Sequence, residues 1–188
     1  MKGTDKPCLV FIAVILVMAV VFLGGCTSTE TPVIRPLHAT SFQPGQVLQG
    51  IGDVTGQGVM VQGVPRAVIG TVTFTIGLTP GTKSIDLENL TVIYADAVRT
   101  QTLTSIEGLR GDPPKGAWGI LTISHEKGKP NDRLEFDEQA IIRINPTAAM
   151  LPGQLITIAV KPKEGQTLTF RCLIPTTVTQ GENILQSE

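Results

Sequence analysis

The sequence contains little that would support catalysis, metal binding or disulfide bonding. Its two histidines, His38 and His125, lie near no nucleophile motif and no metal-ligand spacing such as HExxH. The three cysteines are Cys8, Cys26 and Cys172, and they leave no pair within the predicted folded domain. No CxxC spacing occurs, so neither a disulfide framework nor a zinc site is expected. We predict a protein that is not an enzyme and that needs no cofactor or metal.

Charged and aromatic residues are also scarce. Charged residues make up 16% of the chain, the formal net charge is -1, and no block of like charge occurs. These values exclude the basic surface that nucleic-acid binding requires, and no small-molecule substrate is evident. Aromatic residues make up only 4%, whereas Thr, Val, Ile and Gly are abundant, which favours strands and tight turns. The composition therefore predicts an all-β domain of ordinary size.

One long apolar run is present, at residues 8–23. It is apolar on all sides, which indicates a membrane-inserted or signal helix rather than a helix of a soluble core. Two lysines precede it, and no Lys or Arg follows until Arg35. This distribution places residues 1–7 in the cytoplasm and residues 27–188 outside the cell membrane.

The end of this run, Leu-Gly-Gly-Cys at residues 23–26, resembles the lipobox of a lipoprotein signal peptide. In lipoproteins this cysteine becomes the lipidated mature N-terminus, so Cys26 is a candidate lipidation site. The alternative is a signal anchor that is retained and contains the cysteine by chance. Both interpretations place the chain at the outer face of the membrane, and they differ in whether the apolar helix remains in the mature protein.

The chain divides into three predicted regions. Residues 1–26 form the signal or anchor helix, and residues 27–45 form an extended tether, because three prolines lie between positions 32 and 44. Residues 46–188 form an Ig-like antiparallel β-sandwich of about seven strands, since runs of period two recur between turn residues. The expected strands are residues 47–51, 59–62, 68–78, 91–95, 118–124, 140–144, 155–161 and 167–174.

The connections between these strands carry turn residues. We expect tight turns at 79–82 and 162–166, with Gly165 at a positive φ. Residues 84–90 predict a short helical turn that begins with Ser84 as its cap. From Gly181 onward the chain is expected to be a frayed tail.

Four acidic residues, Asp132, Glu135, Asp137 and Glu138, are a weak candidate for a Ca²⁺ site. Their spacing matches no EF-hand. A solvated loop between strands explains them equally well, so no metal ligand is assigned.

Two further residues have candidate roles within the domain. Asn89 begins the one usable N-glycosylation sequon, Asn-Leu-Thr, and is a candidate glycosylation site on an exported domain. Cys172 falls on the apolar face of its strand, which indicates a buried core residue rather than a reactive thiol.

Three apolar residues fall at positions where the alternation expects outward-facing side chains: Ile69, Ile141 and Leu173. Either another subunit covers them, or their strands lie beneath a loop of the same chain. The pattern leaves both explanations open.

The last strands resemble the end of the archaeal flagellins, the archaellins. The resemblance is carried by residues 156–171 (ITIAVKPKEGQTLTFR), followed by residues 174–177 and 183–185. Residues 72–81 (VTFTIGLTPG), followed by 86–87 and 92–96, are similar to the opening of the same β-domain. The resemblance covers about residues 65–188 and implies an Ig-like β-domain in a structural, non-enzymatic surface protein with other flagellin-like subunits as partners.

Two functions follow. The first is a component of, or an accessory to, archaellum filaments, attached to the membrane through its N-terminal helix or a lipid. The second is a membrane-tethered lipoprotein whose domain serves binding or adhesion at the cell envelope. Archaellins use a long helix in the filament core, whereas Pro32 and Pro36 follow the apolar run closely here, and a lipobox-like Cys26 is not an archaellin feature.

Overall fold

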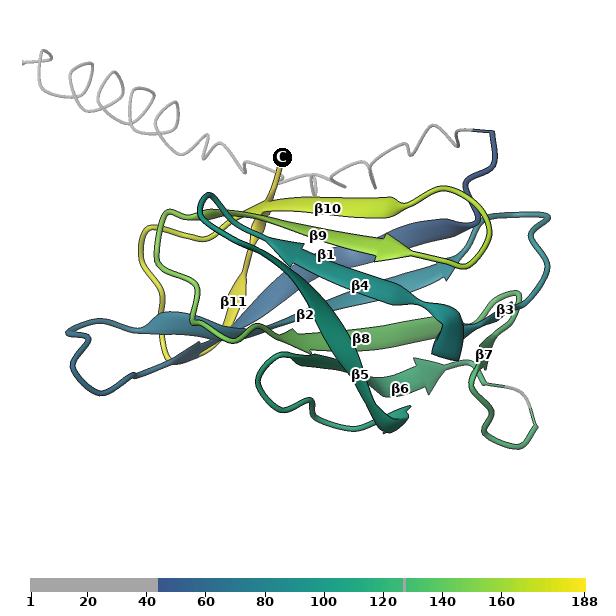
Figure 1. Cartoon of the computed structure of the whole chain (residues 1–188), viewed down its shortest axis with the longest axis horizontal. Coiled ribbons are helices and arrows are strands. Elements are labelled where there is room, and N and C mark those ends of the chain that lie inside the picture. The colour runs from purple at the N-terminus through teal and green to yellow at the C-terminus, as the bar shows by residue number, and fades with distance from the viewer. Residues whose placement is uncertain (1–43, 127) are drawn as a thin grey trace, which may run out of the picture. The chain divides into compact units, whose positions relative to one another are not determined.

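Strands account for most of the chain that the structure describes. The computed structural model describes residues 44–126 and 128–188, with strands β1 to β12 and a short 3-10 helix, η1 (Figure 1). The predicted N-terminal helix, most of the predicted tether, Cys26 and His38 lie outside these residues. Within residues 44–126 and 128–188, no helix has the length and apolar character needed to cross a membrane.

The strands differ widely in length. The longer ones are β1 (Leu48–Val59), β2 (Val68–Leu78), β4 (Thr91–Ala95), β5 (Thr100–Arg110), β6 (Ala117–Ser124), β8 (Gln139–Asn145), β9 (Leu155–Lys161), β10 (Leu168–Leu173) and β11 (Gly181–Ile184). The two-residue strands are β3 (Ile85–Asp86), β7 (Arg133–Leu134) and β12 (Gln186–Ser187), and η1 covers Leu87–Asn89.

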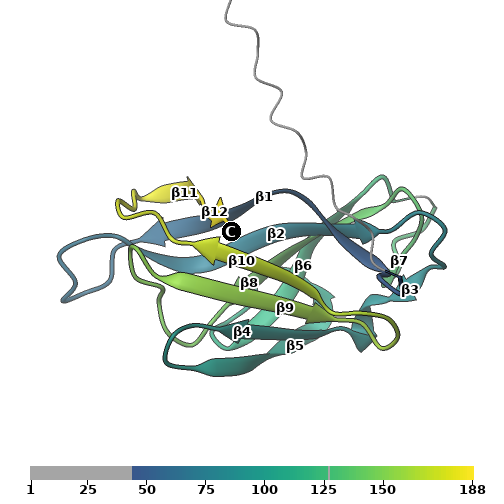
Figure 2. The same ribbon diagram turned by 90° about the horizontal axis from the view of Figure 1, so that it is seen from above.

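Hydrogen bonds between neighbouring strands connect ten of these strands into one sheet. Its order is β11-β1-β2-β8-β6-β5-β4-β9-β10-β12, and the short strands β3 and β7 pair separately. The sheet folds into two layers, one formed by β11, β1, β2, β8 and β6 and the other by β4, β9, β10 and β12 (Figures 1 and 2). Strand β5 joins the two layers, because its first residues, Thr100 to Leu103, pair with β4, whereas Thr104 and Ser105 pair with β6. All pairs are antiparallel except β5 with β6. The predicted all-β fold is confirmed, and Figure 2 shows it from a second side.

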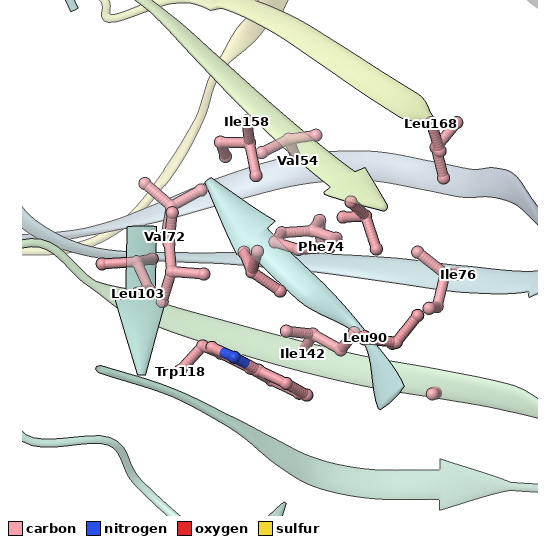
Figure 3. Packing of buried hydrophobic residues seen from close by; sticks show 14 of the residues in the cluster. Val54, Val72, Phe74, Ile76, Leu90, Leu103, Trp118, Ile142, Ile158 and Leu168 are labelled. Atoms are coloured by element: carbon pink, nitrogen blue, oxygen red, sulfur yellow. The ribbon is translucent and has the colours of Figure 1, made fainter. Parts of the chain in front are cut away.

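The two layers enclose one hydrophobic core (Figure 3). In β2 the residues Val72, Phe74 and Ile76 are buried, while the threonines between them are partly exposed, as the period of two requires. Phe74 meets Phe170 of β10 across the core, with ring centroids 4.9 Å apart and an interplanar angle of 44°. Trp118 of β6 is also fully buried. The core thus holds strands from both layers together.

Most predicted strands and turns agree with the structure. Three expected strands, at residues 68–78, 91–95 and 155–161, coincide with β2, β4 and β9. The predicted turns contain Gly81 and Gly165 at φ 82° and 98°. A glycine with a positive φ therefore lies in the turn that follows β2 and in the turn that follows β9.

The first strand differs from the prediction. One or two short strands were expected here, at residues 47–51 and 59–62, but one long continuous strand, β1, covers Leu48–Val59. Its register against β2 shifts between Ile51 and Thr55, next to Gly52 at φ 68°. This bulge interrupts the alternation and so conceals the continuity of the strand in the sequence.

The predicted helical turn at residues 84–90 is shorter than expected and has another cap. Ile85 and Asp86 form β3, and the helix covers only Leu87–Asn89. Asp86, not Ser84, caps it, because its carboxylate accepts a hydrogen bond from the Glu88 N–H at 3.0 Å.

Strand β5 and the two C-terminal strands, β11 and β12, were absent from the prediction. Residues after Gly181 were expected to fray. Instead the C-terminus forms β11, paired with β1, and β12, paired with β10, with Leu185 buried between them. The C-terminus thus contributes strands to both layers.

Candidate functional site

The polar residues considered for catalysis or metal binding have different environments. His125 is exposed directly after β6, at φ 61°. Asp132 lies 3.7 Å from Arg110 between Oδ1 and Nε, and the buried Glu138 accepts a hydrogen bond from the Glu135 N–H at 2.9 Å. Among residues 44–126 and 128–188, no group of three or more His, Cys, Asp or Glu residues could hold a metal ion.

Cys172 is a core residue, as predicted. Its side chain is 1% exposed, and burial raises the pKa of the thiol to about 11. A neutral, inaccessible thiol has no reactive role.

The apolar residues expected to face outward do not share one environment. Ile69 is fully buried, and it exchanges backbone hydrogen bonds of 2.9 and 2.8 Å with Met150 in the loop between β8 and β9. Ile141 and Leu173 are partly exposed. Ile69 is therefore covered within its own chain and belongs to the core.

The predicted glycosylation residue, Asn89, is the last residue of η1 and is exposed. Its Nδ2 donates a hydrogen bond to Asp86 Oδ2 at 2.9 Å. Glycosylation at Asn89 remains a prediction.

The two ends of the sandwich differ in chemistry. We call the end at which the described chain begins the proximal end. There the Gln166 N–H donates to Gly45 O at 3.0 Å, and the Thr79 N–H donates to Val47 O at 3.1 Å. The loops at this end, 79–84, 125–138 and 162–166, contain most of the charged loop residues of the domain.

The opposite end, which we call the distal end, is apolar. It consists of the loops 60–67, 96–99, 111–116, 146–154 and 174–180, with the first residue of β9. Five of the seven large hydrophobic side chains that are exposed in the described residues lie here, namely Met60, Val61, Val98, Leu151 and Leu155. Apolar side chains gathered at one end of a soluble domain indicate an interaction surface.

The few charges of the distal loops are mostly neutralised within the domain. Asp96 lies 2.8 Å from the Nε of Arg99, and Asp112 lies 2.6 Å from Arg143 Nη1. Arg66, in contrast, has no ion pair with any residue in the described ranges. The distal surface therefore combines apolar side chains with positive charge.

The proximal end contains an open groove of about 620 Å³. Its lining comprises Gln49, Ile51, Gly77, Leu78, Pro80, His125, Phe136, Asp137, Glu138 and Gln139. Phe136 is 59% exposed on this groove, which makes it the one large apolar side chain that the described proximal loops expose. The lining includes neither Lys nor Arg, and its exposed carboxylate is that of Asp137, so the groove combines apolar side chains with one negative charge.

The loop between β4 and β5 is held by Asp96. Burial disfavours the ionised carboxylate, but hydrogen bonds from the Val98 N–H, the Tyr94 hydroxyl and the Arg99 N–H outweigh burial and hold the pKa of Asp96 below its ordinary value. Burial, and then the hydrogen bond to Asp96, raises the pKa of Tyr94. This arrangement fixes the loop that presents Val98 at the distal end.

Because native Asp96 binds its proton more weakly than the unfolded chain does, acid favours unfolding. Stability is complete above the unfolded pKa of about 3.9 and falls as the pH drops through the lower native pKa. Asp96→Asn is expected to cost about 1–2 kcal/mol at pH 7, since charge-assisted hydrogen bonds are lost. Urea unfolding at pH 7 and pH 3 measures both effects, and the variant should lose less stability on acidification than the parent.

Any loss of stability in acid that remains in Asp96→Asn is expected to come from Glu126. Hydrogen bonds from Arg110 to Glu126, the shorter at 2.8 Å, are the main reason that the pKa of Glu126 also lies below its ordinary value. An acid dependence of the Asn variant identical to that of the parent would show that Asp96 is not a source of the pH effect.

No protein-family model matches the sequence, and no match is found among curated proteins. Solved structures do match the fold. The flagellin FlaB1 of Methanocaldococcus jannaschii aligns with a TM-score of 0.56 and 16% identity over 74% of this chain and 96% of that chain. The archaeal flagellum of Methanospirillum hungatei aligns with a TM-score of 0.53 and 18% identity over 95% of this chain and 94% of that chain.

These structures bear out the resemblance found in the sequence. The described domain has an archaellin-like β-fold, in agreement with phrases such as residues 156–171. The two neighbours are an archaeal flagellin and an archaeal flagellum, and at 16% and 18% identity they show the fold alone.

Proposed function

We propose that this chain is a non-enzymatic structural protein of the archaellum, situated outside the cytoplasm as a component of the filament or an accessory to it. The observation that carries the proposal is the fold match to flagellin FlaB1, which covers 96% of that chain. An apolar distal end, presented by an otherwise polar β-domain, supports a role in contact between proteins.

The N-terminal residues distinguish two forms of this function. A retained apolar helix at residues 8–23 would allow a filament subunit, with flagellin-like subunits and the membrane as partners. Removal of residues 1–25 and lipidation of Cys26 would give a tethered accessory protein instead, because no apolar helix would remain to bundle in a filament. The lipobox-like residues 23–26 and the closely following Pro32 and Pro36 favour the accessory form.

The same residues 23–26 also support a second candidate function, a lipoprotein whose β-domain binds or adheres at the cell envelope. This function differs from the first in its dependence on the archaellum. An adhesin would remain in the membrane fraction whether or not filaments are present.

Fractionation of native cells tests the proposal. We expect the chain to sediment with archaella or their membrane-embedded bases after detergent extraction of the membranes, and to leave that fraction in a strain that lacks archaella. An unchanged distribution in that strain would favour the adhesin and contradict the archaellum role.

Mass spectrometry of the mature protein tests the form of attachment. We expect a mature N-terminus at Cys26 with lipid attached, and accumulation of unprocessed chain in the Cys26→Ser variant. A mature chain that still contains residues 8–23 would reject the lipoprotein form and support a filament subunit.

A further inference from the structure

The loop between β1 and β2 projects from the distal end. Figures 1 and 2 both show this hairpin extending beyond the neighbouring loops. Met60 and Val61 at its tip are 52% and 39% exposed, and the Val64 N–H donates to Val61 O at 3.0 Å, which closes a defined turn. Arg66 is exposed and has no ion pair within the described chain. The hairpin thus presents two apolar side chains and one free cation.

The groove at the proximal end lies on the same two strands. Gln49 and Ile51 belong to β1, and Gly77 and Leu78 belong to β2, so the groove and the hairpin mark opposite ends of one strand pair. The 11 residues of β2 span about 36 Å at roughly 3.3 Å per residue. Consider a second molecule that is shifted along the strand direction by about the length of β2 plus the length of the hairpin loop. Its hairpin would then lie at the groove of the first molecule.

The two surfaces are complementary in polarity. The groove offers the exposed Phe136 and the partly exposed Ile51 to apolar side chains, and Asp137 in its lining is an exposed carboxylate. The hairpin offers Met60 and Val61 with Arg66 beside them. Contact between two hairpins would bring equal charges together, whereas contact between hairpin and groove joins opposite charges.

We propose that the β1–β2 hairpin of one copy of this chain docks in the proximal groove of a second copy, in a head-to-tail arrangement. Such a contact is heterologous, because each copy uses a different surface, and it continues from copy to copy without closing. One hairpin buries less surface than a stable complex between free proteins needs. The contact therefore forms when the N-terminal segments hold the domains at high local concentration.

This inference rests on the proposed structural function and specifies a partner for it. It also gives the exposed side chain of Phe136 a role, which is contact with the second copy.

Site-directed photo-crosslinking tests the contact in the full chain, reconstituted in vesicles of its native lipids. The photoreactive residue p-benzoylphenylalanine replaces Val61, and mixed isotope-labelled and unlabelled chains identify links between molecules. We expect links to residues 125–139 of the second copy. The same substitution at Val98, which is 82% exposed on the distal end, serves as the matched control and should give at most one fifth as many links to that segment.

Charge variants test the specificity of the contact. Arg66→Glu and Asp137→Asn are each expected to lower the yield of links at least fivefold, while Lys115→Glu, also on the distal end, should leave it unchanged. Asn tolerates the positive φ of 69° at Asp137, so this variant preserves the loop.

Other outcomes overturn the inference. Links between two hairpins, links to lipid, or links unaffected by both charge variants would each reject a hairpin-to-groove contact. Failure of this experiment while the chain still fractionates with archaella would reject the contact and leave the proposed function standing. Loss of that fractionation would reject the proposed function itself.

Discussion

Replacing Leu185 by alanine is expected to lower the free energy of unfolding by about 3 kcal/mol, within the range for leucine in a packed core. Leu185 is 2% exposed and belongs to the same hydrophobic cluster as the strands of both layers. Its N–H also donates to Val54 O at 2.9 Å, which fixes the segment in place. Urea unfolding of the full chain, followed by the fluorescence of its single tryptophan, measures the effect.

The preceding residue supplies the control. Ile184 is 62% exposed, so Ile184→Ala should change the free energy of unfolding by less than about 0.5 kcal/mol. Equal small effects at both positions would mean that the C-terminal segment is frayed and adds nothing to the core.

The C-terminal segment matters because it covers an open side of the sandwich. Strand β11 pairs with β1, and β12 pairs with β10, so the last residues pass from one layer to the other. The fit is close at Gly58, where a Cβ atom would collide with the carbonyl oxygen of Thr179. Covering the outer edges of β1 and β10 also removes part of their unpaired backbone groups from other chains.

The sequence predicted the strands that are buried on one face and bounded by turn residues. For residues 68–78 and 155–161 the alternation alone was sufficient, since one face of each strand packs on the core. In β5, by contrast, Leu103 and Leu109 are the only buried residues. This strand turns from one layer to the other, and the positive φ of Leu109 and Gly108 breaks its alternation.

The pairing of the C-terminus depends on the completed fold. Residues 181–188 contain only two apolar residues, Ile184 and Leu185, and no alternation that predicts a strand. Their place is decided by the edges of β1 and β10, which are remote in sequence. Strand pairing that depends on such distant partners cannot be predicted from the local sequence.

The sequence did not predict the two candidate interaction surfaces, the distal end and the proximal groove. It did contain one indication of the distal surface. Met60, Val61 and Leu151 are large apolar residues within segments rich in Gly and Pro, where a loop would ordinarily be polar. Such residues are candidates for contact surfaces even before a structure exists. That they gather at one end, opposite the groove with Phe136, follows only from the antiparallel topology.

Phe74→Ala is expected to have the largest effect on stability, about 4 kcal/mol, because a buried phenylalanine is lost together with a contact between layers. Phe74 is 1% exposed, and its ring lies 4.9 Å from that of Phe170 in the opposite layer. The fluorescence of buried Trp118 reports the unfolding. Phe136→Ala makes the same chemical change at a side chain that is 59% exposed, and it should cost less than about 0.5 kcal/mol. If both variants were equally destabilised, the core and the docking groove would not be the separate features that the two phenylalanines indicate.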